Sequence, residues 1–153
     1  MVASKIRKIK EMMPDAFICV DVIVGTRGET ELYFEDAYRF IEGLEVTQLH
    51  VFSYSERPGT QALKIDHVVS PEEKHRRSQR LLALSDEKTK AFYARHIGKE
   101  AIVLAEKSKA GMPMHGFTDN YIRVELEHDD ALDNKLVRVK LGDFNEDGTA
   151  LKG

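Results

Sequence analysis

The sequence has 153 residues, an apolar fraction of 42% and a net charge of −3. That is enough to build a core in one ordinary domain or two small ones, and the acidic balance argues against a protein that wraps nucleic acid through bulk positive charge. No apolar run approaches the ~20 residues that span a bilayer, and residues 1–10 are too charged for a signal-peptide core, so we expect a cytoplasmic protein with no membrane partner. Because Cys19 is the only cysteine, neither a disulfide nor a multi-cysteine metal site is expected.

The first third of the chain has the pattern of a βαβ unit. Apolar residues at helical spacing predict a short first helix that ends at Pro14, and the apolar run 17–24 is typical of a strand that is covered on both faces. Thr30 can cap the next helix, and Gly43 ends it. Its predicted buried stripe consists of Tyr33, Phe34, Ala37, Phe40, Ile41 and Leu44. Residues 46–52 then form a second strand, which is parallel to the first.

A strong helix start follows at Ser70. Ser70 can act as the cap, Pro71 suits the first helical position, and Glu73 completes a capping box. We expect a long helix from here to about His96. Its main core candidates are Leu81, Leu82, Leu84, Ala91 and Phe92.

From Glu100 onward the pattern changes to short strands. β-favouring residues occupy 101–105, 117–127 and 136–141, with Asp, Asn and Gly clusters between them, which predicts a small antiparallel barrel. Residues 1–98 hold 15 basic and 15 acidic residues, whereas residues 99–153 hold 8 and 11. This shift of charge places a domain boundary near Gly98 and predicts two domains, 1–97 and 98–153.

The predicted α/β part is incomplete as a sheet. Parallel strands occur almost only inside larger sheets, and two strands with two or three helices cannot cover both faces of one. We therefore expect either a fragment of a larger protein or a chain that self-associates through its exposed sheet edge.

Function is expected at the carboxyl ends of the two strands, because ligands of α/β sheets bind there. Gly25 and Gly28 bracket a turn that leads into a helix, which suits either a plain βα turn or close approach of a ligand. Asp21 interrupts an apolar strand, and a buried carboxylate needs a partner. An ion pair or backbone contact would satisfy it, and a direct functional role is the alternative.

Two further groups of residues are candidates for RNA contact. Lys74, His75, Arg76, Arg77 and Arg80 concentrate positive charge at the start of the long helix, where they form either a solvated helix face or phosphate contacts. In the barrel, Phe117 and a group of neighbours offer aromatic, amide and guanidinium groups that could stack on unpaired bases and bond to their edges. These neighbours are Thr118, Asn120, Tyr121 and Arg123. The histidines show no metal-ligand spacing.

Three motifs carry a resemblance to a known family. The segments Asp21-Val-Ile-Val-Gly-Thr-Arg-Gly-Glu-Thr30 and Tyr54-Ser-Glu-Arg-Pro-Gly-Thr60 resemble the last strand ends of the radical-SAM half-barrel of the tRNA methylthiotransferases. In that family Phe and Pro usually stand where Thr26 and Arg27 stand here. The segment Gly116-Phe-Thr-Asp-Asn-Tyr121 most resembles the branch that acts on threonylcarbamoyladenosine in tRNA.

The resemblance implies a C-terminal fragment of such an enzyme: the terminal βα elements of a radical-SAM partial TIM barrel, a long connecting helix and a TRAM β-barrel. The full-length parent would use S-adenosylmethionine and two iron–sulfur clusters to add a methylthio group to a modified adenosine in the anticodon arm of tRNA. The cluster cysteines of the family are absent here, so we expect this fragment to be inactive, with no catalytic residue and no bound cofactor or metal. The alternative is a stand-alone RNA-binding or assembly module without catalysis.

The resemblance also implies roles for particular residues. Those expected to border S-adenosylmethionine are Asp21, Gly25, Thr26, Phe52 and Tyr54. Those expected to contact tRNA are Arg57, Lys74, Arg76, Arg77, Arg80, Thr118, Asn120, Tyr121 and Arg123.

Overall fold

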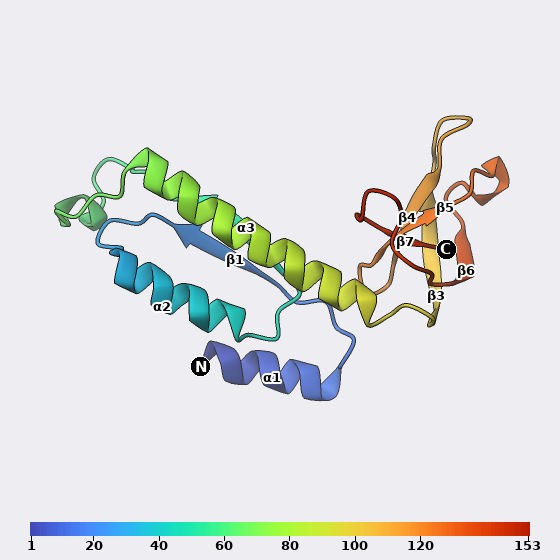
Figure 1. Ribbon diagram of the computed structural model, residues 1–153, viewed down its shortest axis with the longest axis horizontal. Coiled ribbons are helices and arrows are strands. Elements are labelled where there is room, and N and C mark those ends of the chain that lie inside the picture. Colours follow the sequence, from blue (N-terminus) through green and yellow to red (C-terminus); the bar gives the residue numbers. More distant parts are fainter. The chain divides into compact units, whose positions relative to one another are not determined.

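A computed structural model describes all of residues 1–153, which divide into two compact units, Met1–Thr89 and Lys90–Gly153 (Figure 1). The first unit is helical with two strands, and the second is mainly β. The division lies inside the long helix, earlier in the chain than the boundary expected near Gly98, because the last turn of that helix packs with the second unit.

The first unit contains the predicted βαβ arrangement. Its elements in chain order are α1 (Val2–Met12), β1 (Cys19–Val24), α2 (Glu31–Glu42), β2 (Gln48–Ser53), the 3₁₀ helix η1 (Gln61–Lys64) and α3 (Pro71–Ala94). The two strands pair in parallel, from Cys19 opposite Gln48 to Val24 opposite Ser53.

One face of this two-stranded sheet carries the core of the first unit. Buried side chains from all three helices meet the alternate strand residues Val20, Val22 and Val24 there. The buried members of this cluster are Ile6, Val24, Phe34, Val46, Leu49, Leu81 and Leu84. The helices therefore all pack against the same face of the sheet.

The other face of the sheet is exposed, so the expectation of a strand covered on both faces is wrong for this chain. Ile23 and Phe52 are paired across the strands, and they are 58% and 51% exposed. Asp21 and His50 lie on the same face, two pairs along. Because side chains alternate along a strand, a layer on one side buries only every second residue of an apolar run.

Both predicted helix starts are present. The Thr30 hydroxyl accepts a hydrogen bond from the Tyr33 N–H at 3.3 Å, and the Ser70 hydroxyl accepts one from the Glu73 N–H at 3.2 Å. The Glu73 carboxylate does not complete the predicted capping box, because it accepts hydrogen bonds from Arg76 and Arg77.

The predicted helix stripes are only partly correct. In α2 the buried side is formed by Phe34 with the half-buried Tyr38 and Ile41, and the half-buried Leu44 just after the helix joins them. Tyr33, Ala37 and Phe40, which were expected to be buried, are exposed. In α3 Leu81, Leu84 and Phe92 are buried, whereas Leu82 and Ala91 face solvent. A single covered face gives each helix a narrower apolar stripe than burial between two layers would.

The second unit is built on a five-stranded sheet with the order β6-β3-β4-β5-β7. Its elements are β3 (Glu100–Glu106), β4 (Met114–Thr118), β5 (Arg123–Leu126), the 3₁₀ helix η2 (Asp130–Leu132), β6 (Leu136–Lys140) and β7 (Leu151–Lys152). The pairs are antiparallel except β5 with β7, which is parallel, so the prediction of a wholly antiparallel arrangement is corrected at this edge. The sheet is curled, because a Cβ on Gly153 after β7 would lie 3.4 Å from Val139 of β6, at the opposite edge of the sheet order.

A tight turn divides the β-favouring segment 117–127 into two strands. The Thr118 N–H donates to the Ile122 carbonyl at 3.0 Å, and the Ile122 N–H donates to the Thr118 hydroxyl at 2.9 Å. Tyr121 in this turn has φ +65°, a conformation that non-glycine residues rarely adopt. β4 therefore ends at Thr118, and β5 begins at Arg123.

The neighbouring residues Leu81 and Leu82 provide a matched test of the packing of α3. Leu81 is 2% exposed within the core, and Leu82 is 45% exposed. We expect Leu81→Ala to lower the free energy of unfolding by about 2 to 5 kcal/mol, because it removes buried methyl groups and leaves a cavity. We expect Leu82→Ala to change it by no more than about 0.5 kcal/mol. Urea denaturation of both variants would measure this, and equal losses would contradict the packing described here.

Candidate functional site

The loop after β1 is a glycine turn that is closed by its own glutamate. Gly25 and Gly28 have φ +79° and +84°, which glycine adopts without strain. The Gly25 N–H donates to both carboxylate oxygens of Glu29 at 3.1 Å, and the Gly28 N–H donates to the His67 carbonyl at 2.9 Å. This N–H group, at the carboxyl end of β1, is therefore bound to a carboxylate of the same loop.

Arg27 joins this loop to the segment that follows β2. Its Nε lies 2.7 Å from the Glu56 carboxylate, and its Nη1 donates to the carbonyls of Leu63 and Ile65 at 3.1 and 2.9 Å. At this position the sequence departs from the family motif, and the structure shows that the arginine connects the two loops.

The residues expected to border a cofactor fall into two groups. Gly25 and Tyr54 come together through Lys74, whose aliphatic stem packs against Gly25 and whose ammonium donates to the Tyr54 carbonyl at 3.1 Å. Thr26 lies half-buried in the turn itself. Asp21 and Phe52 lie instead on the exposed face of the sheet.

The expectation that Asp21 is buried is wrong. Its side chain is 74% exposed, and its carboxylate lies 3.2 Å from the Nδ1 of His50 on the paired strand. The neighbouring Cys19 lies on the same face, where partial burial, together with the charge of Asp21, raises the pKa of its thiol.

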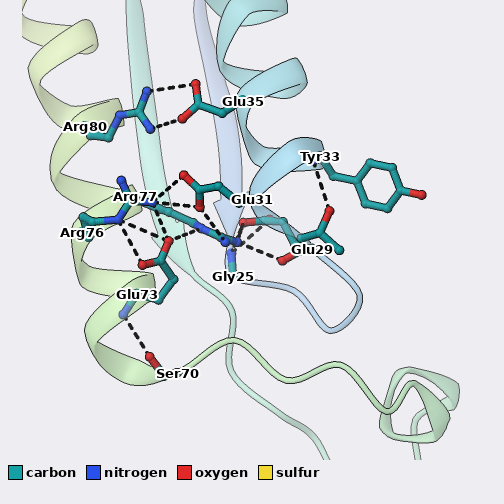
Figure 2. Close-up of polar contacts among 11 residues, drawn as sticks. Gly25, Glu29, Glu31, Tyr33, Glu35, Ser70, Glu73, Arg76, Arg77 and Arg80 are labelled. Atoms are coloured by element: carbon teal, nitrogen blue, oxygen red, sulfur yellow. Dashed lines mark hydrogen bonds and ion pairs between the residues drawn. The ribbon is translucent and has the colours of Figure 1, made fainter.

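The basic residues at the start of α3 are mostly paired with glutamates (Figure 2). Nη2 of Arg76 lies less than 2.8 Å from a carboxylate oxygen of Glu31 and from one of Glu73. Arg80 forms a bidentate ion pair with the Glu35 carboxylate. Arg77 binds Glu29, Glu31 and Glu73. In this network four carboxylates, those of Glu29, Glu31, Glu35 and Glu73, outnumber the three guanidinium groups by one.

Arg77 lies at the centre of this network, and its side chain is only 4% exposed. Its Nε donates to Glu73 at 2.8 Å, its Nη1 to the Glu29 carboxylate at 2.8 Å and its Nη2 to Glu31 at 3.1 Å. The guanidinium also lies 5.2 Å from the centre of the Phe34 ring. A buried and fully paired arginine is a structural cation, so the earlier alternative of a phosphate-contacting Arg77 is not supported by its geometry.

The network changes the acidity of its carboxyl groups. Arg76, assisted by Arg77, lowers the pKa of Glu73 from its ordinary value of 4.5 to about 2. Arg80 lowers the pKa of Glu35 in the same way. Both carboxylates therefore remain charged well below neutral pH.

Sequence reasoning missed the glutamates of this network. Glu31 and Glu35 of α2 are four residues apart, as are their partners Arg76 and Arg80 of α3, and this matched spacing was the available signal. Glu29 lies in the loop before α2 and carries no such signal. Of the other positive residues near these loops, Lys74 bonds to Tyr54, whereas Arg57 lies exposed in the turn after β2.

In the second unit the tight turn after β4 gathers the expected RNA-binding residues. Thr118 is buried, and its hydroxyl donates to the Asn120 side-chain oxygen at 2.7 Å. The Asn120 amide nitrogen lies 3.2 Å from Nε2 of the buried His96. The Tyr121 ring is stacked on Phe117, with ring centres 4.7 Å apart, and its side chain is exposed. Thr118 and Asn120 thus fix the turn, and Tyr121 is presented to solvent.

This aromatic pair belongs to a row of side chains that crosses the sheet. Leu136, Leu104, Phe117 and Arg123 are successive cross-strand partners, so they lie on one face. Leu104 and Leu136 are exposed, as are Ile102 and its partner Arg138 two pairs away. Residues 100–104 and 136–138 were not among the predicted site residues, although their alternating pattern placed them on this face.

Two further observations bear on the kind of site that residues 1–153 can form. No group of three or more His, Cys, Asp or Glu side chains is arranged to hold a metal ion. None of the helices is both long enough and apolar enough to cross a membrane.

Comparison with known proteins finds relatives over most of the chain. It is 34% identical over 143 residues to the threonylcarbamoyladenosine tRNA methylthiotransferase MtaB of Bacillus subtilis, which covers 91% of this chain and 32% of the relative. It is 39% identical over 140 residues to the tRNA-2-methylthio-N(6)-dimethylallyladenosine synthase of Methylobacillus flagellatus, covering 90% and 32%. The synthase of the same name from Aliarcobacter butzleri is 34% identical over 153 residues, covering 98% and 34%. The chain thus spans about a third of the length of these relatives. No protein-family profile matches the sequence.

The lowered pKa of Glu73 predicts a pH dependence of stability. A carboxyl group whose pKa falls on folding contributes stability above its unfolded value of 4.5, and this stability is lost as the pH falls toward 2. We therefore expect Glu73→Gln to be less stable than the wild type at pH 7 and to lose less stability between pH 4.5 and pH 2. Urea denaturation across this pH range would measure the effect.

Glu72→Gln is the matched control, because Glu72 is adjacent, exposed and forms no ion pair. Its profile should follow that of the wild type. If Glu73→Gln also followed the wild type, the arginine contacts of Glu73 would contribute nothing to folding.

Proposed function

Since the chain belongs to the tRNA methylthiotransferase family, we propose that it is the C-terminal part of an enzyme that adds a methylthio group to a modified adenosine beside the anticodon. The observation that carries this proposal is the identity of 34–39% to such enzymes over about nine-tenths or more of the chain. The reaction would insert sulfur into a C–H bond of the adenosine and methylate that sulfur.

In this proposal the loops of the first unit border S-adenosylmethionine, which supplies the radical chemistry and the methyl group when bound. Gly25, Thr26 and Tyr54 lie at the carboxyl ends of the strands, which is where α/β sheets bind their ligands. Asp21 and Phe52 lie on the exposed sheet face, which in a closed barrel would face the interior. The sheet has only two strands, so each has an unpaired edge that further strands could join, either from the same protein or from a second copy.

The iron–sulfur clusters of such an enzyme do not fit the residues of this chain. A cluster needs several thiolates, and Cys19 is the single cysteine. No step of the reaction is therefore assigned to a side chain of residues 1–153, and the proposal requires the cluster ligands from elsewhere in the enzyme.

The proposed nucleoside is N6-threonylcarbamoyladenosine. The segment 116–121 supports this choice over isopentenyl-adenosine, and it forms the end of β4 and the fixed turn that presents Tyr121. Relatives with both kinds of name match the chain, so the choice depends on this segment.

The second unit is the proposed tRNA-binding surface. Tyr121 and Phe117 offer an aromatic stack, and Arg123 and Arg138 flank the same face with positive charge. Thr118 and Asn120 hold the turn in the conformation that exposes Tyr121. Residues held in rare backbone conformations often occur at ligand-binding sites, and Tyr121 is one of two non-glycine residues with positive φ. Arg57 and Lys74 of the first unit are further candidates for phosphate contact.

A second candidate function is an RNA-binding or assembly module without chemistry. The observation that favours it is the stacked pair of rings formed by Phe117 and the exposed Tyr121, because such a pair could bind an unpaired base without any chemistry. The two functions share the surface around Tyr121, so that surface is tested first.

We expect Tyr121→Ala to weaken binding of a labelled anticodon stem-loop by about 1 to 3 kcal/mol, because a stacking partner for a base is lost. Tyr121→Phe keeps the ring and should bind like the wild type. Tyr33→Ala is the matched control, since Tyr33 is an equally exposed tyrosine of the first unit. Titration at two salt concentrations would measure this, with Arg138→Gln alongside, which should flatten the salt slope by about 0.7 if it contacts a phosphate. Equal affinity of all four variants would contradict the proposed surface.

A further inference from the structure

We infer that Arg77 is a positioning residue for the glycine turn that follows β1, acting through Glu29, and that it thereby sets the affinity of this turn for S-adenosylmethionine. This inference rests on the proposed function for its ligand. Arg77 itself does not touch the turn's glycines; it lies one helix away, in α3.

The first step is the contact between the turn and Glu29. Gly25 has positive φ, and its N–H is held by both oxygens of the Glu29 carboxylate. The side chain of Glu29 is only 15% exposed. A carboxylate in such a place needs a counter-charge, because water no longer solvates it.

The second step is the contact between Glu29 and Arg77. One nitrogen, Nη1, donates to the Glu29 carboxylate at 2.8 Å and to the Glu29 main-chain carbonyl at 3.0 Å. Arg77 therefore holds both the side chain and the backbone of Glu29. Figure 2 shows the guanidinium between the glycine turn and the first turns of α2 and α3.

The third step is the anchoring of Arg77 itself. Glu73 and Glu31 take its remaining donors, and Phe34 packs against its plane. The guanidinium thus has a single orientation, which a lysine could not reproduce because it lacks the planar array of donors. The neighbouring Lys74 closes the other side of the turn, because a side chain on Gly25 would overlap its stem.

These contacts make the start of α3 part of the wall of the proposed cofactor site. Loss of Arg77 would leave Glu29 without its counter-charge and free the Gly25 N–H. The turn would then sample other conformations, and a ligand that needs one of them would bind more weakly.

The test compares Arg77→Met, Arg77→Lys and Glu29→Gln by amide hydrogen exchange, read at Gly25 by NMR. We expect exchange at Gly25 to rise about tenfold in Arg77→Met and Glu29→Gln, as for loss of a hydrogen bond to a charged acceptor, with only partial recovery in Arg77→Lys. Exchange in the middle of β1, at Val22, should stay at the wild-type rate. A merely structural role would raise exchange at both sites together.

Glu35→Gln is the matched control. It removes a carboxylate from the same helix, where Glu35 pairs with Arg80 and makes no contact with the turn. Exchange at Gly25 should be unchanged in this variant. If Arg77→Met and Glu29→Gln both left exchange at Gly25 unchanged, the positioning role would be overturned.

The second arm measures binding of S-adenosylmethionine to the full-length enzyme that carries this sequence. We expect Arg77→Met and Glu29→Gln to raise the Kd about tenfold and Glu35→Gln to leave it unchanged. Faster exchange at Gly25 with an unaltered Kd would overturn the assignment of the turn to this ligand, while the positioning of the turn by Arg77 would stand. The two failures are therefore distinguishable.

Discussion

A guanidinium group removed from water has to be surrounded by acceptors, and the structure of the first unit is organised around one such group, that of Arg77. Its donors reach Glu29 in the loop after β1, Glu31 at the start of α2 and Glu73 in α3. Three segments that are far apart in the sequence must therefore meet at one point. Removing one partner would leave a buried charge without compensation. The free energy lost in this way exceeds the net stabilisation that the intact pair provides. The glycine turn, the start of α2 and the start of α3 are consequently held as one unit.

This constraint also determines where positive charge is available for other partners. Glutamates form ion pairs with Arg76, Arg77 and Arg80, so the densest basic cluster of the sequence is not a cationic surface. The face of the second unit offers a different kind of surface, with a stacked aromatic pair and an arginine among apolar side chains. Such a surface suits unpaired bases better than a phosphate backbone. The two units thus have separate proposed roles: cofactor binding at the strand ends of the first unit and tRNA binding on the sheet of the second.

Local signals in the sequence predicted much of the fold. The caps at Thr30 and Ser70, the βα alternation and the change of pattern near Glu100 depend on neighbouring residues, and each is found in the structure. The errors depend on distant partners. Whether one or both faces of the strand 17–24 are buried depends on how many layers of the protein pack against the sheet. The pairing of Arg77 involves Glu29, 48 residues away in the sequence. The turn that exposes Tyr121 was missed because its apolar neighbours continued the strand pattern on both sides. The glycines of the candidate site were predicted because a turn that needs positive φ favours glycine, which is visible in the sequence itself.

The central claim, that Arg77 and Glu29 act as one unit, is tested most directly by a double-mutant cycle on the free energy of unfolding. The cycle compares the wild type, Arg77→Met, Glu29→Gln and the double variant. The account predicts a coupling energy of about 1 to 3 kcal/mol, because either single change leaves the other group buried without its partner. Effects of the two changes that simply add, to within about 0.5 kcal/mol, would contradict it.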